Sequence, residues 1–196
     1  MSTTHDDAPL AAQVRHLEAL LEERGWLAPG EIDERLDAFA AGGSPANGAA
    51  VVARAWVDPY FRARLLADGN AAIGELGFSM GGALQEQKLI VVANDADEHH
   101  VVVCTLCSCY PIALLGPSPS WYKSEAYRSR VVRDPRGVLR ELGLELPAST
   151  RITVWDASAE SRYLVLPRRP EGTDDLTEQE LAALVTRKGL IGTAAV

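Results

Sequence analysis

All three cysteines of the chain, Cys104, Cys107 and Cys109, lie within the short stretch VVVCTLCSCY. This clustering constrains the fold, because a loop that carries so many sulfurs must be held in one shape. The valines before Cys104 are β-branched residues, which are typical of a strand. The sequence therefore predicts a strand that runs directly into a cysteine loop, residues 104–109, which we call the claw loop.

Three interpretations of the C-x-x-C-x-C pattern compete. The cysteines could be small buried hydrophobic residues, although chance clustering of all of them is improbable. They could form part of a zinc or iron–sulfur site, with His99 or His100 as a further ligand, but the second C-x-x-C pair common in such sites is missing. The third interpretation is a compact site that uses main-chain nitrogen as well as sulfur.

The C-S-C spacing favours this third interpretation. The amide nitrogens of Ser108 and Cys109 can close small chelate rings through a metal with the sulfurs of Cys107 and Cys109, and Cys104 can stand perpendicular to that plane. Thiolates and deprotonated amides are strong donors that suit a trivalent, low-spin ion. Together they fill five corners of an octahedron, and a vacant sixth corner is typical of a catalytic metal site.

Hydrophobic periodicity and turn residues predict two domains. The chain has 196 residues, of which 47% are hydrophobic, enough for one good-sized core and an arm. We expect a helical arm over residues 1–46 that contacts another chain, with helices at 8–24 and around Ile32 to Phe39. Residues 47–196 are expected to form the catalytic domain that carries the claw loop.

The catalytic domain is predicted to be α+β, a layered α-β-β-α arrangement, because helices and strands come in groups without strict alternation. Asp58 is expected to cap a helix, and Thr177 with Glu180 to form a capping box. His99 and His100 are assigned to an exposed polar loop. The expected helices are 48–57, 59–67, 124–132, 135–143 and the final one after Thr177; the expected strands are 88–94, 101–104, 151–156 and 162–167.

Charge and composition exclude several classes of partner. The net charge is −8 and no basic run is longer than Arg168-Arg169, so neither nucleic acid nor an anionic membrane is an expected partner. No stretch of eighteen apolar residues and no basic-apolar leader is present. An odd number of cysteines in such a chain indicates a reducing compartment, and we expect the cytoplasm.

The stretch VCTLCSCY resembles the metal claw of nitrile hydratase α subunits. The resemblance extends over about residues 47–192, through SWYKSEAYRSRVVRDPRGVLRELGLELP, VWDASAESRYLVLPRRPEGT and ELAALVTRKGLIG. It implies an axial thiolate at Cys104, a sulfinate at Cys107, a sulfenate at Cys109, and main-chain nitrogen ligands from Ser108 and Cys109. Thr105 and Tyr110 match the cobalt form of the claw, which implies Co(III), with Fe(III) as the lesser alternative.

The same resemblance implies further catalytic residues beside Cys109. Trp121 matches a substrate-pocket tryptophan, Arg162 an arginine that supports the claw, and Gln85 a pocket glutamine. The competing interpretations are a core aromatic for Trp121, a surface ion pair for Arg162 and a solvated strand end for Gln85. Ile112 stands where the family usually has tryptophan, and GPSP replaces GLPP. Loss of the bulky indole is expected to enlarge the pocket. We therefore expect the substrate to be a larger, heteroaromatic nitrile, such as the nucleoside nitrile of toyocamycin-type enzymes.

The resemblance also implies a reaction and partners. A nitrile is expected to be hydrated to its amide, through attack on the nitrile carbon by the Cys109 sulfenate oxygen or by water. The arginines that hold the oxidised sulfurs are expected from a nitrile hydratase β subunit, or from two smaller β-like chains. The alternatives are a thiocyanate hydrolase subunit and a non-catalytic, cysteine-rich module for metal binding or delivery.

Overall fold

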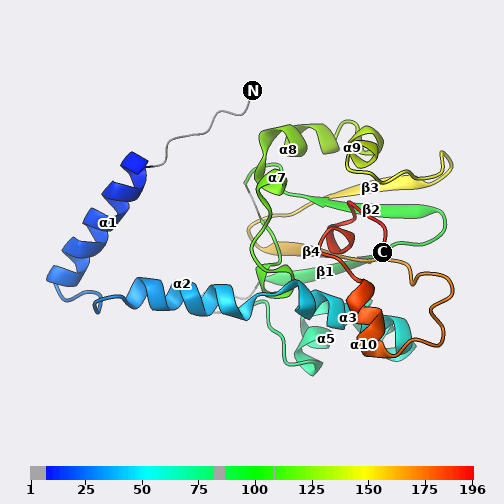
Figure 1. The fold of residues 1–196 in the computed structure, drawn as a ribbon, viewed down its shortest axis with the longest axis horizontal. Helices are drawn as coiled ribbons and strands as arrows, with labels where there is room; N and C mark the ends of the chain where they lie inside the picture. Colours follow the sequence, from blue (N-terminus) through cyan, green and yellow to red (C-terminus); the bar gives the residue numbers. More distant parts are fainter. Residues whose placement is uncertain (1–7, 82–86, 108) are drawn as a thin grey trace. The chain divides into compact units, whose positions relative to one another are not determined.

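The computed structural model describes residues 8–81, 87–107 and 109–196, and it divides the chain into two compact units, Met1–Ala41 and Gly42–Val196 (Figure 1). The first unit contains α1 (Ala8–Glu23) and all but the last residue of α2 (Glu31–Gly42). No residue of α1 is buried, and Leu10, Val14 and Leu17 are more than half exposed. None of the helices in the described ranges is long and apolar enough to span a bilayer.

The second unit places most of its helices where the sequence predicts them. Asp58 caps α4 by accepting from the main-chain nitrogens of Tyr60 and Phe61, as expected. The predicted capping box of Thr177 and Glu180 is also confirmed. The helices of this unit are α3 (Pro45–Val57), α4 (Pro59–Ala67), α5 (Gly69–Glu75), α6 (Ile112–Leu115), α7 (Ser120–Lys123), α8 (Glu125–Val131), α9 (Pro135–Glu141), α10 (Glu178–Leu184) and the 3-10 turn η1 (Gly189–Ile191).

Four strands form two parallel pairs. They are β1 (Lys88–Ala93), β2 (Glu98–Val103), β3 (Arg151–Asp156) and β4 (Ser161–Leu166). β1 pairs with β4 and β2 with β3, so strands that follow each other along the chain are not hydrogen-bonded partners. Tight turns over 94–97 and 157–160 reverse the chain between the pairs. The ends of β2 and β3 therefore lie beside the starts of β1 and β4, and this common end carries the claw loop.

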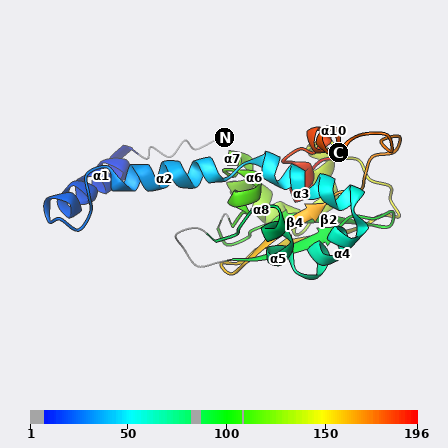
Figure 2. The ribbon, with the colours of Figure 1, turned by 90° about the horizontal axis from the view of Figure 1, so that it is seen from below.

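The strands form the middle layer of the unit. Figure 1 shows them in the order β3, β2, β4, β1, with α8 and α9 beyond β3 and with α3 and α5 beyond β1. In the view turned by 90°, the strands lie between the C-terminal segment and helices α4 and α5 (Figure 2). The core between the layers includes Val51, Phe61, Val102 and Leu164, all at most 2% exposed. The layered α+β prediction is confirmed.

The prediction that His99 and His100 lie in an exposed loop is wrong. Both belong to β2 and are only 7% and 8% exposed. His99 lies between the side-chain amide of Asn94 (3.1 Å) and the carbonyl oxygen of Gly192 (2.8 Å). His100 Nδ1 accepts a hydrogen bond from the indole of Trp155 (3.1 Å). The strand extends further upstream than its valines predict, because these partners satisfy both imidazoles inside the protein.

Candidate metal centre

The claw loop begins where β2 ends, and it brings the three sulfurs together. Cys104 is 1% exposed, whereas Cys109 is half-buried and Cys107 exposed. The Sγ atoms of Cys104 and Cys107 are 3.4 Å apart, and those of Cys107 and Cys109 are 3.3 Å apart. All three lie within 4.8 Å of one another. These separations exceed the ~2.05 Å of a disulfide bond, so the sulfurs form a cluster of single donor atoms.

The sulfur separations distinguish octahedral from tetrahedral coordination. With metal–sulfur bonds of about 2.3 Å, two thiolates at a right angle would be about 3.3 Å apart, whereas two at the tetrahedral angle would be about 3.8 Å apart. The observed 3.3 and 3.4 Å match the right angle. Each of these two sulfur pairs therefore fits adjacent corners of an octahedron, which suits a trivalent transition metal better than structural zinc.

Neither candidate histidine can complete a zinc site. His100 precedes Cys104 by four residues along the strand, which corresponds to about 13 Å of extended chain. The ring nitrogens of His99 are both engaged by Asn94 and Gly192. Within the described ranges, the three cysteines are the only cluster of cysteine, histidine or carboxylate side chains with metal-ligating geometry. The interpretation as a zinc site with an imidazole ligand is therefore not supported.

The loop is held from β3 by Asp156. One carboxylate oxygen accepts from the main-chain nitrogen of Thr105 at 2.9 Å, and the other accepts from the Thr105 hydroxyl at 2.5 Å. This contact exists because β2 and β3 are parallel in a register that places Val103 opposite Asp156. Sequence reasoning assigned no role to Asp156. The feature that could have identified Asp156 is a carboxylate at the last residue of β3, opposite the last residue of the parallel strand β2.

Three more side chains hold the loop and the strand that leads into it, and all come from the segment that contains α7 and α8. The Tyr122 hydroxyl donates to the carbonyl oxygen of Cys109 at 2.9 Å, and the Tyr127 hydroxyl donates to that of Val102 at 2.8 Å. A terminal nitrogen of Arg128 donates to the carbonyl oxygen of Thr105 at 3.1 Å. None of the three was predicted from the sequence to bear on the site.

Arg162 lies at the claw end because β4 starts there, directly after the turn over 157–160 that follows β3. Its side chain is 8% exposed, and one terminal nitrogen donates to the main-chain carbonyls of Ser158, Ala159 and Ser161. Its buried Nε has no partner among the described residues. Burial raises the pKa of the Cys109 thiol to about 12, and the positive charge of Arg162 acts in the opposite direction. The surface ion pair considered for Arg162 is absent from the described residues.

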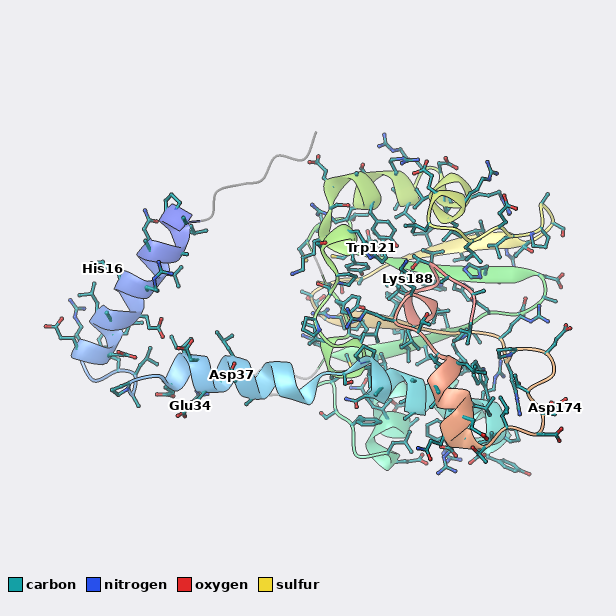
Figure 3. The ribbon with its side chains drawn as sticks, in the orientation of Figure 1. His16, Glu34, Asp37, Trp121, Asp174 and Lys188 are labelled. Carbon is teal, nitrogen blue, oxygen red and sulfur yellow. The ribbon has the colours of Figure 1, made fainter. Side chains whose placement is uncertain are left out.

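Trp121 lies on α7, at the same end of the unit as the claw loop (Figure 3). It is partly buried, and its ring packs edge-on against Tyr127 with centroids 5.0 Å apart. It thus contacts the two tyrosines that hold the claw loop. Gln85 and Ser108, a predicted pocket residue and a predicted ligand residue, lie outside the described residues.

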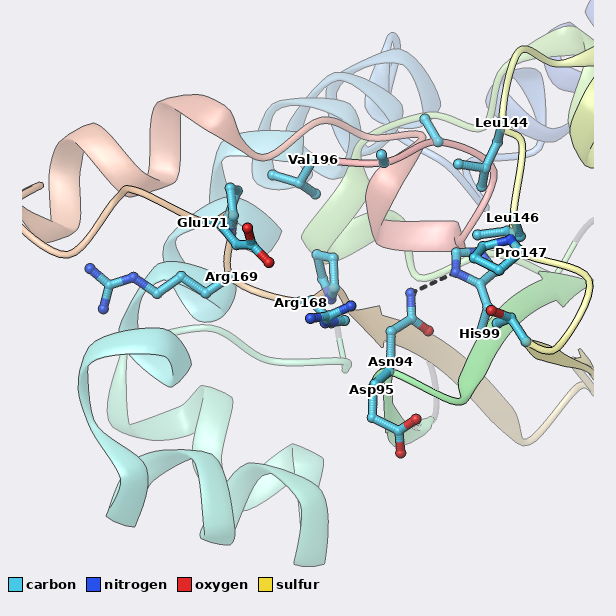
Figure 4. Close-up of a pocket in the computed structure, with 16 residues that line it drawn as sticks. Asn94, Asp95, His99, Leu144, Leu146, Pro147, Arg168, Arg169, Glu171 and Val196 are labelled. Carbon is cyan, nitrogen blue, oxygen red and sulfur yellow. Dashed lines mark hydrogen bonds between the residues drawn. The ribbon is translucent and has the colours of Figure 1, made fainter.

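A cavity lies at the other end of the strands, near the turn over 94–97. Its volume is about 300 Å³, and Asn94, His99, Arg168 and Arg169 are among its lining residues. Figure 4 shows the hydrogen bond between Asn94 and His99, with Arg169 extending away from that pair. No residue of the claw loop lines this cavity. Its size alone therefore does not make it the reaction site.

The chain matches known proteins over nearly its whole length. The family model described as nitrile hydratase, alpha chain, matches residues 8–194. The cobalt-containing nitrile hydratase subunit alpha of Pseudonocardia thermophila is 50% identical over 184 residues, 93% of this chain and 89% of that protein. A double mutant of Fe-type nitrile hydratase from Comamonas testosteroni Ni1 superposes with a TM-score of 0.89 at 43% identity, covering 97% of this chain and 92% of that one. Thiocyanate hydrolase subunit gamma of Thiobacillus thioparus is 46% identical over 158 residues, 76% of this chain and 65% of that protein.

Proposed function

This chain belongs to the nitrile hydratase α-chain family, and from that membership we propose that it hydrates a nitrile to the amide at a non-corrin Co(III) centre. The observation that carries the proposal is the cluster of three sulfurs at right-angle separations of 3.3 and 3.4 Å. Cobalt is favoured over iron because the Pseudonocardia relative, at 50% identity, is a cobalt protein. The trivalent state is inferred from the donor set.

The burial of the cysteines supports different roles for them. We propose that Cys104, which is 1% exposed, stays a thiolate, whereas Cys107 and Cys109 are oxidised to the sulfinate and the sulfenate. Oxidants reach accessible thiolates first, and metal binding keeps sulfur in the thiolate form. The amide nitrogens of Ser108 and Cys109 would complete five ligands and leave one corner for substrate.

The reaction adds one water across the C≡N bond, with oxygen going to carbon and both protons to nitrogen. Bound cobalt would supply a Lewis acid that polarises the nitrile. The Cys109 sulfenate oxygen, or water held by it, would attack the nitrile carbon. Arg162 would stabilise negative charge at Cys109, since its buried guanidinium carries no carboxylate partner. We assign Trp121 and Gln85 to the substrate pocket.

We propose that a β-type partner, one subunit or two smaller chains, completes the site. The exposed Cys107 lies next to Leu106, whose side chain is 89% exposed, so the claw loop presents both sulfur and apolar surface to a covering protein. On α1, Leu10, Val14 and Leu17 are 61%, 57% and 58% exposed at helical spacing. This stripe is the surface that we assign to partner binding in the arm, residues 1–46. We assign the complex to the cytoplasm, because its cysteines are used for metal and not for disulfides.

The proposal is tested on the chain co-expressed with its β-type partner in medium supplied with cobalt. Elemental analysis should give one cobalt per chain, and intact mass should show three added oxygens on the claw cysteines. Nitrile should give amide. Labile divalent metal, unoxidised cysteines and no turnover would instead identify a metal-binding module. Carbonyl sulfide from thiocyanate, without amide from any nitrile, would identify a thiocyanate hydrolase, the function of the Thiobacillus relative.

We also propose that the pocket accepts bulky, heteroaromatic nitriles. Ile112 opens α6 directly after the claw loop and is only partly buried, and it occupies less space than an indole. Comparing kcat/KM for small aliphatic and large aromatic nitriles measures this preference. A clear preference for the small nitriles would contradict it, and Ile112→Trp should move the preference toward them.

A further inference from the structure

The claw loop must be shaped before metal can bind to it, and the contacts of the helices beside it show how this is achieved. Donors from a single short segment, residues 120–131, reach three carbonyl oxygens: one on β2 just before the loop, one at the second residue of the loop and one at its last residue. These are the Tyr127 hydroxyl to Val102, the Arg128 guanidinium to Thr105 and the Tyr122 hydroxyl to Cys109. These hydrogen bonds therefore hold the strand that leads into the loop and both ends of the loop.

The segment is built as a rigid body. Ser124 joins its two helices, because its hydroxyl donates to the carbonyl oxygen of Trp121 (2.7 Å) and accepts from the main-chain nitrogen of Tyr127 (3.2 Å). Ser124 is thus both the C-cap of α7 and the N-cap of α8. The rings of Trp121, Tyr122 and Tyr127 pack on one another with centroids 5.0 to 6.2 Å apart. The hydroxyl groups are therefore held in fixed positions.

The hydroxyl groups are also permanent donors. Tyr122 is fully buried and Tyr127 is 7% exposed. A tyrosine hydroxyl has an ordinary pKa of about 10, so it is protonated and can donate at neutral pH. Each hydroxyl consequently keeps its hydrogen bond, and each carbonyl keeps its direction. Because a peptide unit is planar, fixing a carbonyl oxygen also fixes the following N–H group.

We propose that α7 and α8 form a template that shapes the claw loop for metal insertion, with Tyr122, Tyr127 and Arg128 as its positioning residues. The inference rests on the proposed function, because it assigns these residues to the cobalt site. Thr105 is an example. Asp156 holds its main-chain nitrogen and Arg128 holds its carbonyl oxygen, so the peptide units before and after Thr105 are both held in place. Preorganisation of this kind spares the metal the entropic cost of ordering the loop.

Arg128 contributes charge as well as direction. Three thiolates and two deprotonated amides carry five negative charges against three on a trivalent ion, so the complete site is anionic. Arg128 forms no salt bridge among the described residues, and its buried Nε is unpartnered there. A cation that is not neutralised by a carboxylate, held against the loop, offsets part of the negative charge of the assembled site.

The test uses the full chain purified from cobalt-free medium and titrated with Co²⁺ in a competing chelator buffer. Tyr122→Phe keeps the ring and removes only the hydroxyl, and Arg128→Gln removes the charge and the guanidinium fork. Each should weaken Co²⁺ uptake about tenfold, the equivalent of one buried hydrogen bond. The sulfur-to-cobalt absorption band should shift as well, and Arg128→Lys should recover part of the loss. Urea unfolding, followed in parallel, reports folding separately from metal uptake.

Two matched controls accompany these variants. Arg130 lies on α8 and pairs with Glu141 on the surface, and Tyr163 stacks on Trp155. Arg130→Gln and Tyr163→Phe should leave uptake unchanged. Wild-type uptake and absorption in both Tyr122→Phe and Arg128→Gln would overturn the template, even if their urea midpoints fall. Failure of the wild-type chain to bind Co²⁺ through its cysteines, or of the complex to hydrate nitriles, would instead overturn the proposed function.

Discussion

The two ends of the strand layer are built from the same parts and differ in what they leave at the surface. At the claw end, β2 and β3 finish as a parallel pair, and at the other end β1 and β4 do the same. Ligand sites of parallel sheets lie beyond such carboxyl ends, so both ends are candidates. Their hydrogen bonds and the cysteines of the claw end distinguish them.

At the far end the side chains satisfy one another and the turn. Asp95 accepts from the main-chain nitrogens of Asp97 and Glu98, and His99 is engaged by Asn94 and Gly192. At the claw end, side chains bind the main chain of the loop, and the sulfurs of Cys107 and Cys109 remain accessible. Because the supporting side chains at the claw end bind main-chain atoms, the cysteine side chains of the loop remain available to a ligand. We base the proposal that the reaction takes place at the claw end on this difference, and not on cavity size.

The largest effect should come from removing one claw sulfur. Cys109→Ala takes away a ligand and the proposed nucleophile together, so turnover should fall by at least about 10⁴-fold, as for other residues that act as a unit. Cobalt content and the rate of amide formation measure this. His99→Gln at the far end is the matched change, and it should leave turnover within about twofold because it lies beyond coupling distance. Equal losses from the two changes would remove the distinction between the ends.

The next effect concerns the support of the loop. Asp156→Asn keeps the size of the side chain but can accept only one of the two hydrogen bonds from Thr105. We expect about tenfold lower kcat, with cobalt content reduced in parallel, because one charge-assisted hydrogen bond is worth about 1.5–3 kcal/mol. Asp174 is exposed in the segment between β4 and α10, and Asp174→Asn serves as the control. Full cobalt content and wild-type kcat in Asp156→Asn would show that the loop keeps its shape unaided.

Arg162→Gln should act on the reaction more than on the metal. The guanidinium is buried near Cys109 and offsets the rise in the pKa of that thiol. Loss of one stabilising charge should lower kcat about tenfold and leave KM within about twofold, since the group acts on charge that develops in the transition state. Steady-state kinetics separate the two quantities. A higher KM with unchanged kcat would assign Arg162 to substrate binding.

The sequence was sufficient for those parts of the site and the fold that depend on neighbouring residues. The claw loop gathers its three cysteines within six residues, and the caps of Asp58 and Thr177 act within one helical turn. The cysteine cluster and both caps join residues that are close in the sequence, so they could be predicted from residue spacing alone. The short helix α5 was missed, although Asp68 stands at its start as a cap and accepts from the main-chain nitrogen of Ala71.

Contacts between distant segments could not be read in this way. A run of valines predicts a strand, but not which strand pairs with it, so the parallel register of Val103 and Asp156 had no local signal. The contact between Asp156 and Thr105 follows from that register alone. The same holds for Tyr122 and Arg128, whose partners depend on how α7 and α8 pack. His99 and His100 were misassigned because their acidic neighbours suggest a solvated turn, whereas Asn94, Gly192 and Trp155 satisfy them.

The smallest effect is expected from pH at the far end. Burial lowers the pKa of His99, partly opposed by the hydrogen bond to Gly192, and burial lowers that of His100 too. A histidine whose folded pKa is lowered stabilises the protein above its unfolded pKa of about 6.5, and this contribution is lost as pH falls below that value. The free energy of unfolding should therefore decrease between about pH 7 and 5. His99→Gln should flatten this decrease, at a cost of about 1 kcal/mol at neutral pH for one altered hydrogen bond. The exposed His16 on α1 provides the control, because His16→Gln should leave the pH profile as it is. Urea unfolding at each pH gives both quantities. A profile that stays as steep in His99→Gln and in His100→Gln would show that carboxylates, and not these histidines, set the acid sensitivity.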